Sequence, residues 1–160
     1  MANELSHELP KTQPPATKYE SDMKNKISGS CLCGSVQYSS AAEPLMKAIC
    51  HCENCQRQTG TAFSIIVGVP EDSITFQQDD TLTEYIDHSA SGKKVWRKFC
   101  QNCGSPILSL VENTPGLGII KAGTLNDTSW LNPTIEFWCE SSQPWLEFGD
   151  QMTQYDKNPG

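Results

Sequence analysis

The stretch Cys100-Gln101-Asn102-Cys103-Gly104, CQNCG, decides how this chain folds, because it has the spacing of a metal-binding knuckle. A tight C-x-x-C turn directs two thiolates at one point, and the following glycine permits the positive φ that such turns need. A second cysteine pair has C-x-C spacing and is also followed by glycine, in Cys31-Leu32-Cys33-Gly34. Side chains two apart on an extended chain share one face, which also suits chelation. The two pairs predict a closed, structural zinc site with four thiolate ligands: Cys31, Cys33, Cys100 and Cys103.

A third group of cysteines lies between these pairs, in the segment CHCENC at residues 50–55. Three protein ligands leave one coordination position of zinc open, which is typical of a catalytic site. The alternative is a site closed by a fourth protein ligand. His51 is the nearest candidate, although on a strand it would point away from its neighbours, and Cys139 is the other. The preferred prediction is an open, catalytic zinc held by Cys50, Cys52 and Cys55.

A different partition of the cysteines is also possible. In that partition the first two cysteines of CHCENC join the CQNCG knuckle, and Cys55 joins Cys31 and Cys33. Three sulfurs within six residues bind one metal with a smaller loss of chain entropy on loop closure. The partition into four and three is therefore preferred.

Composition and charge exclude several classes of protein. The chain has 160 residues, the length of one domain, and a formal net charge of −7. It has no basic block, so binding to nucleic acid or to an anionic membrane is not expected. The first residues lack the apolar core of a signal peptide, and the longest apolar run, Ala62–Val69, is too short to span a bilayer. We therefore expect a cytoplasmic protein, whose eight cysteines bind metal rather than form disulfides.

Short apolar or β-branched segments separated by turn residues run from about Ser30 onward, which is typical of a mainly β fold. The predicted limits are a polar tail at 1–26, one zinc-binding domain at 27–150 and a C-terminal tail at 151–160. Helix is expected at most as single turns over Glu53–Thr59 and Asp127–Leu131. The predicted strands are Val36–Ser39, Leu45–His51, Phe63–Val69, Ile74–Gln77, Leu82–Ile86, Lys94–Phe99, Ile107–Val111, Leu117–Lys121, Ile135–Cys139 and Trp145–Phe148.

Three motifs occur in an order that resembles one family: GSCLCGSVQY at 29–38, CHCENCQRQTGTAF at 50–63 and FCQNCGSPI at 99–107. Together with AGTLND at 122–127 and PTIEFWCESSQPW at 133–145, they are similar to the landmarks of the glutathione-dependent formaldehyde-activating enzymes, also called the centromere protein V family. The resemblance implies the β-tent fold, in which small antiparallel sheets surround a zinc-ribbon-like knuckle of four cysteines. It also implies two zinc ions, one structural and one catalytic, on the same two sets of cysteines that chelation favours.

The resemblance further implies a carbon–sulfur lyase that joins the thiol of glutathione to formaldehyde or a related small aldehyde. An open zinc site suits this chemistry, because it binds a thiol as its thiolate. Glutathione carries two carboxylates, so its site needs a cation. Arg57 is the best placed by sequence, followed by Arg97 and Lys98. The alternative function is a zinc-stabilised binding module in which both sites are structural and no catalysis occurs.

Two positions depart from the pattern of the family. Members often carry histidine three residues after the proline of the downstream segment, where this chain has Glu136. They also often carry a basic residue shortly before the Pro-Trp pair, where this chain has Ser142. These departures remove two cationic groups from a region that an anionic thiol would use.

Overall fold

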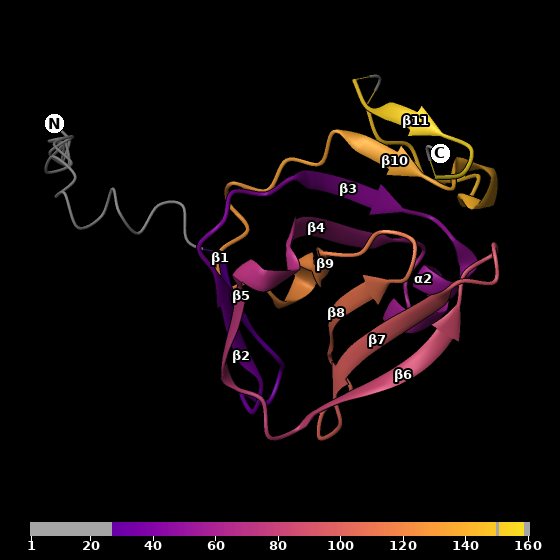
Figure 1. The fold of residues 1–160 in the computed structure, drawn as a ribbon. Coiled ribbons are helices and arrows are strands. Elements are labelled where there is room, and N and C mark those ends of the chain that lie inside the picture. The colour runs from indigo at the N-terminus through magenta and orange to yellow at the C-terminus, as the bar shows by residue number, and fades with distance from the viewer. Residues whose placement is uncertain (1–26, 150, 159–160) are drawn as a thin grey trace, which may run out of the picture.

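The computed structural model describes residues 27–149 and 151–158, and these residues form a mainly β fold, as predicted (Figure 1). One α-helix, α2 (Glu53–Thr59), and short 3₁₀ turns at Glu71–Ser73, Ala122–Thr124 and Cys139–Ser141 accompany the strands. The strands in chain order are β1 (Ile27–Ser30), β2 (Gln37–Ser40), β3 (Met46–Cys50), β4 (Ser64–Pro70), β5 (Ile74–Gln78), β6 (Leu82–His88), β7 (Lys94–Cys100), β8 (Pro106–Val111), β9 (Leu117–Lys121), β10 (Ile135–Phe137) and β11 (Thr153–Tyr155).

The strands form two sheets within the described residues. The smaller sheet is antiparallel, in the order β1-β2-β5, and the larger has the order β11-β10-β3-β4-β9-β8-β7-β6. Figure 1 shows the larger sheet curling, so that β3 and β10 lie across from β6 and β7, with α2 at one end between them. The curl gives this sheet a concave face.

The larger sheet differs from the antiparallel arrangement that the sequence predicts, because β10 runs parallel to both β3 and β11. Parallel neighbours require a long connection. Both parallel pairs have one, since residues 51–134 separate β3 from β10 and residues 138–152 separate β10 from β11. The remaining pairs of the sheet are antiparallel, as expected.

Most predicted elements are confirmed, and the errors lie near the two ends of the domain. The helical turn Glu53–Thr59 is confirmed as α2, whereas Asp127–Leu131 contains no helix. The predicted strand Trp145–Phe148 is wrong, because this segment is turn and irregular chain with the Trp145 side chain exposed. β1 and β11 are strands that the sequence pattern missed.

The domain limits stay a prediction. The predicted tail at 1–26 lies outside the described residues. Within the predicted C-terminal tail at 151–160, β11 pairs with β10 over Thr153–Tyr155. The segment after residue 150 therefore contributes an edge strand to the larger sheet.

The apolar interior has two parts. The main cluster includes Val36, Tyr38, Val67 and Ile120, together with the thiols of Cys31 and Cys100. A second cluster has two further cysteines among its members, and it consists of Ala48, Cys50, Cys55, Ile66 and Phe137. Each part of the interior thus contains thiols from one of the cysteine groups. Among the described residues, no helix is long and apolar enough to cross a membrane.

Gly29 in β1 shows how closely the smaller sheet packs on the rest of the fold. A Cβ at this position would collide with the Tyr38 hydroxyl and the Thr124 backbone carbonyl. The Tyr38 hydroxyl is already bonded to Thr124 Oγ1 at 2.7 Å, so it has little freedom to move. Only glycine fits here without displacing that contact.

We expect Gly29→Ala to destabilise the fold by about 1–3 kcal/mol, the usual cost of overpacking an interior. Urea unfolding followed by tryptophan fluorescence measures this cost. Gly123→Ala is the matched control, because a Cβ there meets no atom within 4 Å. Equal unfolding midpoints for the two variants would show that the close approach at Gly29 is not a constraint.

Candidate metal centres

The first cysteine group joins two turns that are far apart in the sequence. Cys31 and Cys33 lie in the turn between β1 and β2, and Cys100 and Cys103 lie at the end of β7 and in the turn after it. The four Sγ atoms all lie within 4.8 Å of one another. Two of the pairs, Cys31–Cys33 and Cys33–Cys100, are 3.5 and 3.7 Å apart. Tetrahedral zinc with 2.3 Å bonds to sulfur places its ligands about 3.8 Å apart, so this group fits such an ion.

Both turns have the backbone geometry that the sequence predicts. Gly34 and Gly104 have φ of 78° and 76°, a region that favours glycine. The Val36 backbone N–H donates to Cys31 Sγ at 3.2 Å. Hydrogen bonds from Ser105 lower the pKa of the Cys103 thiol to about 5. Donors of this kind favour the thiolate, which is the form that binds a metal.

The second group collects three thiols at the junction of β3 and α2. Cys50 ends β3, Cys52 is the N-cap of α2, and Cys55 lies in its first turn. The three Sγ atoms lie within 4.8 Å of one another, and the Cys55 backbone N–H donates to Cys52 Sγ at 3.3 Å. The structure therefore brings the cysteines together as four and three, and the alternative partition does not match its geometry.

The thiols of the three-cysteine group differ in their pKa values. Hydrogen bonds with Cys52 and Cys55 raise the pKa of the Cys50 thiol. Hydrogen bonds from Cys50 and Cys52 lower the pKa of Cys55 to about 2, and the charges of Lys121 and Arg97 lower it further against the effect of burial. Cys55 is therefore the thiol of this group that ionises most readily, and the cations Lys121 and Arg97 favour its thiolate form.

Neither fourth ligand considered from the sequence belongs to the three-cysteine group. His51 is completely buried, and its Nε2 lies 2.9 Å from Glu136 Oε2. Glu136 is also buried, and its Oε1 accepts a hydrogen bond from Gln154 Nε2 at 3.0 Å. Cys139 lies near His51 and Glu136 as a separate set. His51 thus points away from its cysteine neighbours, as its place after a strand predicts.

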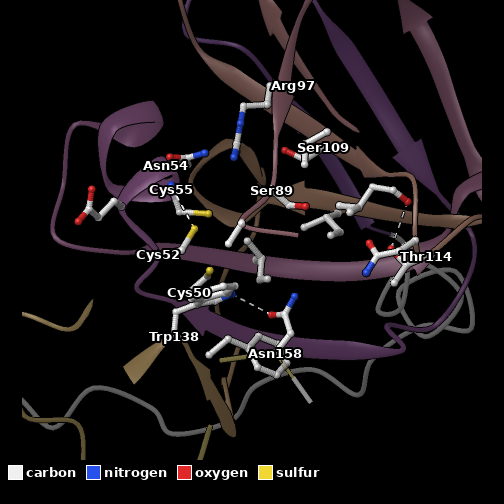
Figure 2. Close-up of a pocket in the computed structure, with 18 of the residues that line it drawn as sticks. Cys50, Cys52, Asn54, Cys55, Ser89, Arg97, Ser109, Thr114, Trp138 and Asn158 are labelled. Carbon is white, nitrogen blue, oxygen red and sulfur yellow. Dashed lines mark hydrogen bonds between the residues drawn. The ribbon is translucent and has the colours of Figure 1, made fainter. Parts of the chain in front are cut away.

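The three-cysteine group opens on a cavity of about 650 Å³ on the concave face of the larger sheet. Figure 2 shows the sulfurs of Cys50, Cys52 and Cys55 at one end of this cavity and Thr114 at the other. The guanidinium of Arg97 reaches toward Asn54 and Cys55 at the cysteine end. Any small molecule in this cavity can therefore meet the thiols directly.

Arg97 is held in place by a network from three elements. Its Nε donates to Asp87 Oδ2 on β6 at 2.8 Å, and its Nη1 donates to Gln58 Oε1 on α2 at 2.8 Å. Asn54 Nδ2 donates to the same Asp87 oxygen at 2.9 Å. Burial lowers the pKa of Arg97, but the hydrogen bond to Asp87 and the negative charges of Cys55 and Asp87 together outweigh burial and raise it. The guanidinium is thus a fixed positive charge whose countercharge is Asp87.

Lys121 is a second cation of the cavity, and the sequence analysis missed it. It is 4% exposed, and its Nζ lies 3.4 Å from Ser64 Oγ. Within residues 27–149 and 151–158, no ion pair joins it to a carboxylate. Burial lowers the pKa of Lys121 below its ordinary value, and the negative charge of Cys55 partly offsets this effect. The pattern Leu117-x-Ile119-x-Lys121 carries the signal, because alternate residues of a buried strand share one face.

The structure does not bring Arg57 to the cavity. Its side chain is 77% exposed and forms a 3.1 Å ion pair with Glu53, one helical turn away. Lys98 lies 4.0 Å from Glu84 and also stands outside the cavity. Of the three cations named from the sequence, Arg97 alone lines it. The assignment of Arg57 to ligand binding stays a prediction.

Trp138 lines the cavity in an unusual backbone conformation. Among the described residues it is the one non-glycine residue with positive φ, at 60°. Its ring Nε1 donates to Asn158 Oδ1 at 3.0 Å. A non-glycine residue in this region costs of order 1–3 kcal/mol and persists where the surroundings hold it. The indole is therefore fixed at the cavity wall.

These features define the class of protein. It is a small, mainly β domain in which one cysteine group ties two turns together, while a second, with three thiols, opens on a cavity beside two buried cations. The chain belongs to the glutathione-dependent formaldehyde-activating enzyme family, whose sequence model matches residues 26–141. The match includes both cysteine groups.

Two curated fungal proteins, each named as a candidate glutathione-dependent formaldehyde-activating enzyme, are similar to this chain. The one from Podospora anserina is 26% identical over 116 residues, which are 69% of this chain and 53% of that protein. The one from Penicillium rubens is 22% identical over 111 residues, with shares of 68% and 55%. The chain therefore spans about half the length of the curated relatives it matches.

A crystal structure of a Rhodobacter sphaeroides protein is also similar in fold. It is 22% identical in sequence and aligns with a TM-score of 0.49. The alignment covers 62% of this chain and 87% of that protein.

Substitutions of Glu136 test whether its buried contact with His51 stabilises the fold. We expect Glu136→Ala to destabilise the fold by about 3 kcal/mol, because it leaves a buried imidazole without its partner. Glu136→Gln keeps an acceptor for His51 and should cost about 1 kcal/mol. Thermal and urea unfolding measure both.

The exposed Glu140 provides the control for these variants. It lies 3.9 Å from Lys157 at the surface, so Glu140→Ala should change stability by less than about 0.5 kcal/mol. If Glu136→Ala were as mild as Glu140→Ala, the buried pair would not contribute to the fold.

Proposed function

We propose that this protein is a zinc-dependent carbon–sulfur lyase that adds the thiol of glutathione, or a related thiol, to formaldehyde or a related small aldehyde. One observation carries the proposal: three thiols, of which Cys50 and Cys55 are buried, line a cavity that also holds two buried cations, apart from the four-cysteine group. Membership of the family and the names of the two fungal relatives support the same reaction. In this proposal the protein works in the cytoplasm, where its thiols stay reduced.

The proposal includes two zinc sites. A structural zinc is assigned to Cys31, Cys33, Cys100 and Cys103, whose sulfur separations fit a tetrahedron. A catalytic zinc is assigned to the three-cysteine group, where neither His51 nor Cys139 is placed to complete the set. Zinc bound there would hold an incoming thiol as its thiolate at neutral pH.

The cations of the cavity have a defined task in this reaction. Three thiolates and one Zn²⁺ carry a net charge of −1, and a substrate thiolate would add another negative charge. Arg97 is already balanced by Asp87, whereas Lys121 has no carboxylate partner among the described ion pairs. Lys121 therefore offsets the excess negative charge and stabilises an anionic thiol at this end of the cavity.

The bond changes of the proposed reaction balance without a redox partner. The thiolate sulfur attacks the aldehyde carbon, so a C–S bond forms while the π pair of the carbonyl moves to its oxygen. That oxygen then takes up the proton that the thiol released when it formed the thiolate, and becomes a hydroxyl. Lys121 is buried, lines the cavity and has no carboxylate partner among the described ion pairs, so we assign to its ammonium the hydrogen bond to this oxygen.

The direct test follows glutathione and formaldehyde by exchange NMR in the presence of the zinc-loaded protein. We expect the protein to speed the exchange between free glutathione and its hydroxymethyl adduct, and glutathione to raise the thermal stability of the protein. A protein that binds zinc but leaves both quantities unchanged would instead be the zinc-stabilised binding module.

The two cysteine groups should respond differently to single substitutions. We expect Cys55→Ser to lose one zinc per chain and the exchange activity, while most of the fold remains. Cys103→Ser should lose the other zinc and unfold the domain, because that group joins two distant turns. Metal analysis and circular dichroism of the two variants measure these effects. Equal losses of structure would show that the two sites do not have separate roles.

Lys121→Met should lower kcat by about 10²-fold, because removal of one preorganised donor to a developing oxyanion has this effect. The change is nearly isosteric, so the zinc content should stay near that of the native chain. Lys94→Met is the matched control, since Lys94 is exposed and does not line the cavity. A Lys121→Met protein with a normal kcat and a raised KM would assign this residue to substrate binding alone.

A further inference from the structure

The cavity beside the three-cysteine group is polar at one end only. The pairing register of the strands places its residues in rows across the concave face. Val95 on β7 lies opposite Val111 on β8. In the next row Arg97 lies opposite Ser109, which in turn lies opposite Ile119 on β9. Along β7, the charged Arg97 is therefore only two residues from the aliphatic Val95.

The aliphatic part of the wall continues on the neighbouring strands. Gly68 pairs with both Ile119 and Met46, and a Cβ at Gly68 would come within 3.1 Å of Met46, so the glycine lets the apolar Met46 side chain pack closely here. Ile119 and Met46 both line the cavity. Leu117, two residues before Ile119, extends the same face. This surface reaches the Thr114 end of the cavity, because the Leu117 backbone N–H donates to the Thr114 carbonyl at 3.2 Å.

Formaldehyde and glutathione do not account for this surface. Formaldehyde has a single carbon and needs no aliphatic wall. Glutathione carries two carboxylates, which need cations at a distance from its thiol. The Lys and Arg residues that line the described cavity are Arg97 and Lys121. Both lie at the cysteine end. Figure 2 shows Arg97 reaching toward Cys55. Lys121 Nζ lies 3.4 Å from the Oγ of Ser64, which is opposite Cys50 in the β3–β4 pair.

Ser109 provides a second, independent observation. It is 3% exposed and lines the cavity, and its Oγ has no hydrogen-bond partner among the described residues. A buried hydroxyl without a partner costs free energy unless a ligand or water meets it. Because Ser109 lies in the row between Arg97 and Ile119, a ligand that bonds it would have a polar atom there and an apolar part beyond.

We propose that the aldehyde used at this site carries an unbranched apolar chain of several carbons. Its carbonyl oxygen meets Ser109 and Lys121, its carbonyl carbon faces the thiols, and its chain lies on Val111, Leu117 and Ile119. This inference rests on the proposed function, and the reaction is the same: one C–S bond forms, the carbonyl π pair moves to oxygen, and the oxygen takes a proton. Glutathione or another thiol then has to project from the open side of the cavity.

The test is the dependence of the rate on chain length in the zinc-loaded protein. Propanal, butanal, pentanal and hexanal have carbonyl groups of similar reactivity, so differences in kcat/KM report on the chain. Each methylene that leaves water on binding contributes a factor of up to about four. With glutathione as the thiol, we expect kcat/KM to rise from propanal to hexanal, and hexanal to exceed propanal by at least tenfold.

Ile119→Thr should flatten this rise, because it replaces the central aliphatic side chain of the wall with a polar one. Ile86→Thr makes the same change on β6 at an exposed residue outside the cavity, and it should leave the rise unchanged. A second measurement needs no catalysis: saturation-transfer NMR should detect 1-hexanol bound to the native protein and more weakly to Ile119→Thr.

The outcomes separate this inference from the proposed function. If formaldehyde is exchanged and kcat/KM is flat from propanal to hexanal, the apolar-chain inference is wrong while the function stands. If no aldehyde is exchanged, the proposed function is wrong. In that case the 1-hexanol measurement still decides whether the cavity accepts an apolar chain, and absence of its signal would overturn the inference.

Discussion

The convergence of four thiols from two distant turns is the constraint on which this structure depends. Cys33 and Cys100 are 67 residues apart in the sequence, yet their sulfurs are 3.7 Å apart. Cys31 and Cys100 are also part of the main apolar cluster, so the tie between the turns and the packing of the core are one arrangement. The smaller sheet is thereby fixed against the larger one. The larger sheet curls, and the cavity lies on its concave face.

The three-cysteine group depends on the charge of its neighbours rather than on a connection between distant turns. Its sulfurs sit where β3 gives way to α2, among apolar residues, and the positive charges of Lys121 and Arg97 stand beside them. A group of anions can be buried only where opposite charge accompanies it. The arrangement therefore accounts for a buried lysine without a carboxylate partner in the described residues. It also concentrates the positive charge of an acidic protein where an anionic sulfur would be needed.

The sequence predicted the parts of the fold that local chemistry determines. The division of cysteines, the helix Glu53–Thr59 and most strands follow from spacing, glycine positions and alternation. Alternation along β9 places Lys121 on a buried face, but its link to the site was missed because Arg97 and Cys55 come from another strand and from α2. Glu136 was noted as a departure from the family, but its contact with His51 depends on β10 lying parallel to β3. The strand expected at Trp145–Phe148 failed because an alternating pattern also occurs in exposed turns, and β11 was missed because its residues are polar and exposed.

The edge strand β11 has a consequence for how this domain can vary. Gln154 on that strand donates a hydrogen bond to Glu136, which contacts His51. Asn158, just beyond the strand, accepts a hydrogen bond from the Trp138 indole at the cavity wall. The last described segment thus contacts the supports of the site, although it contains no thiol and forms none of the central strands. Substitutions in β11 and in the residues just after it can therefore change the shape of the site while every thiol stays in place.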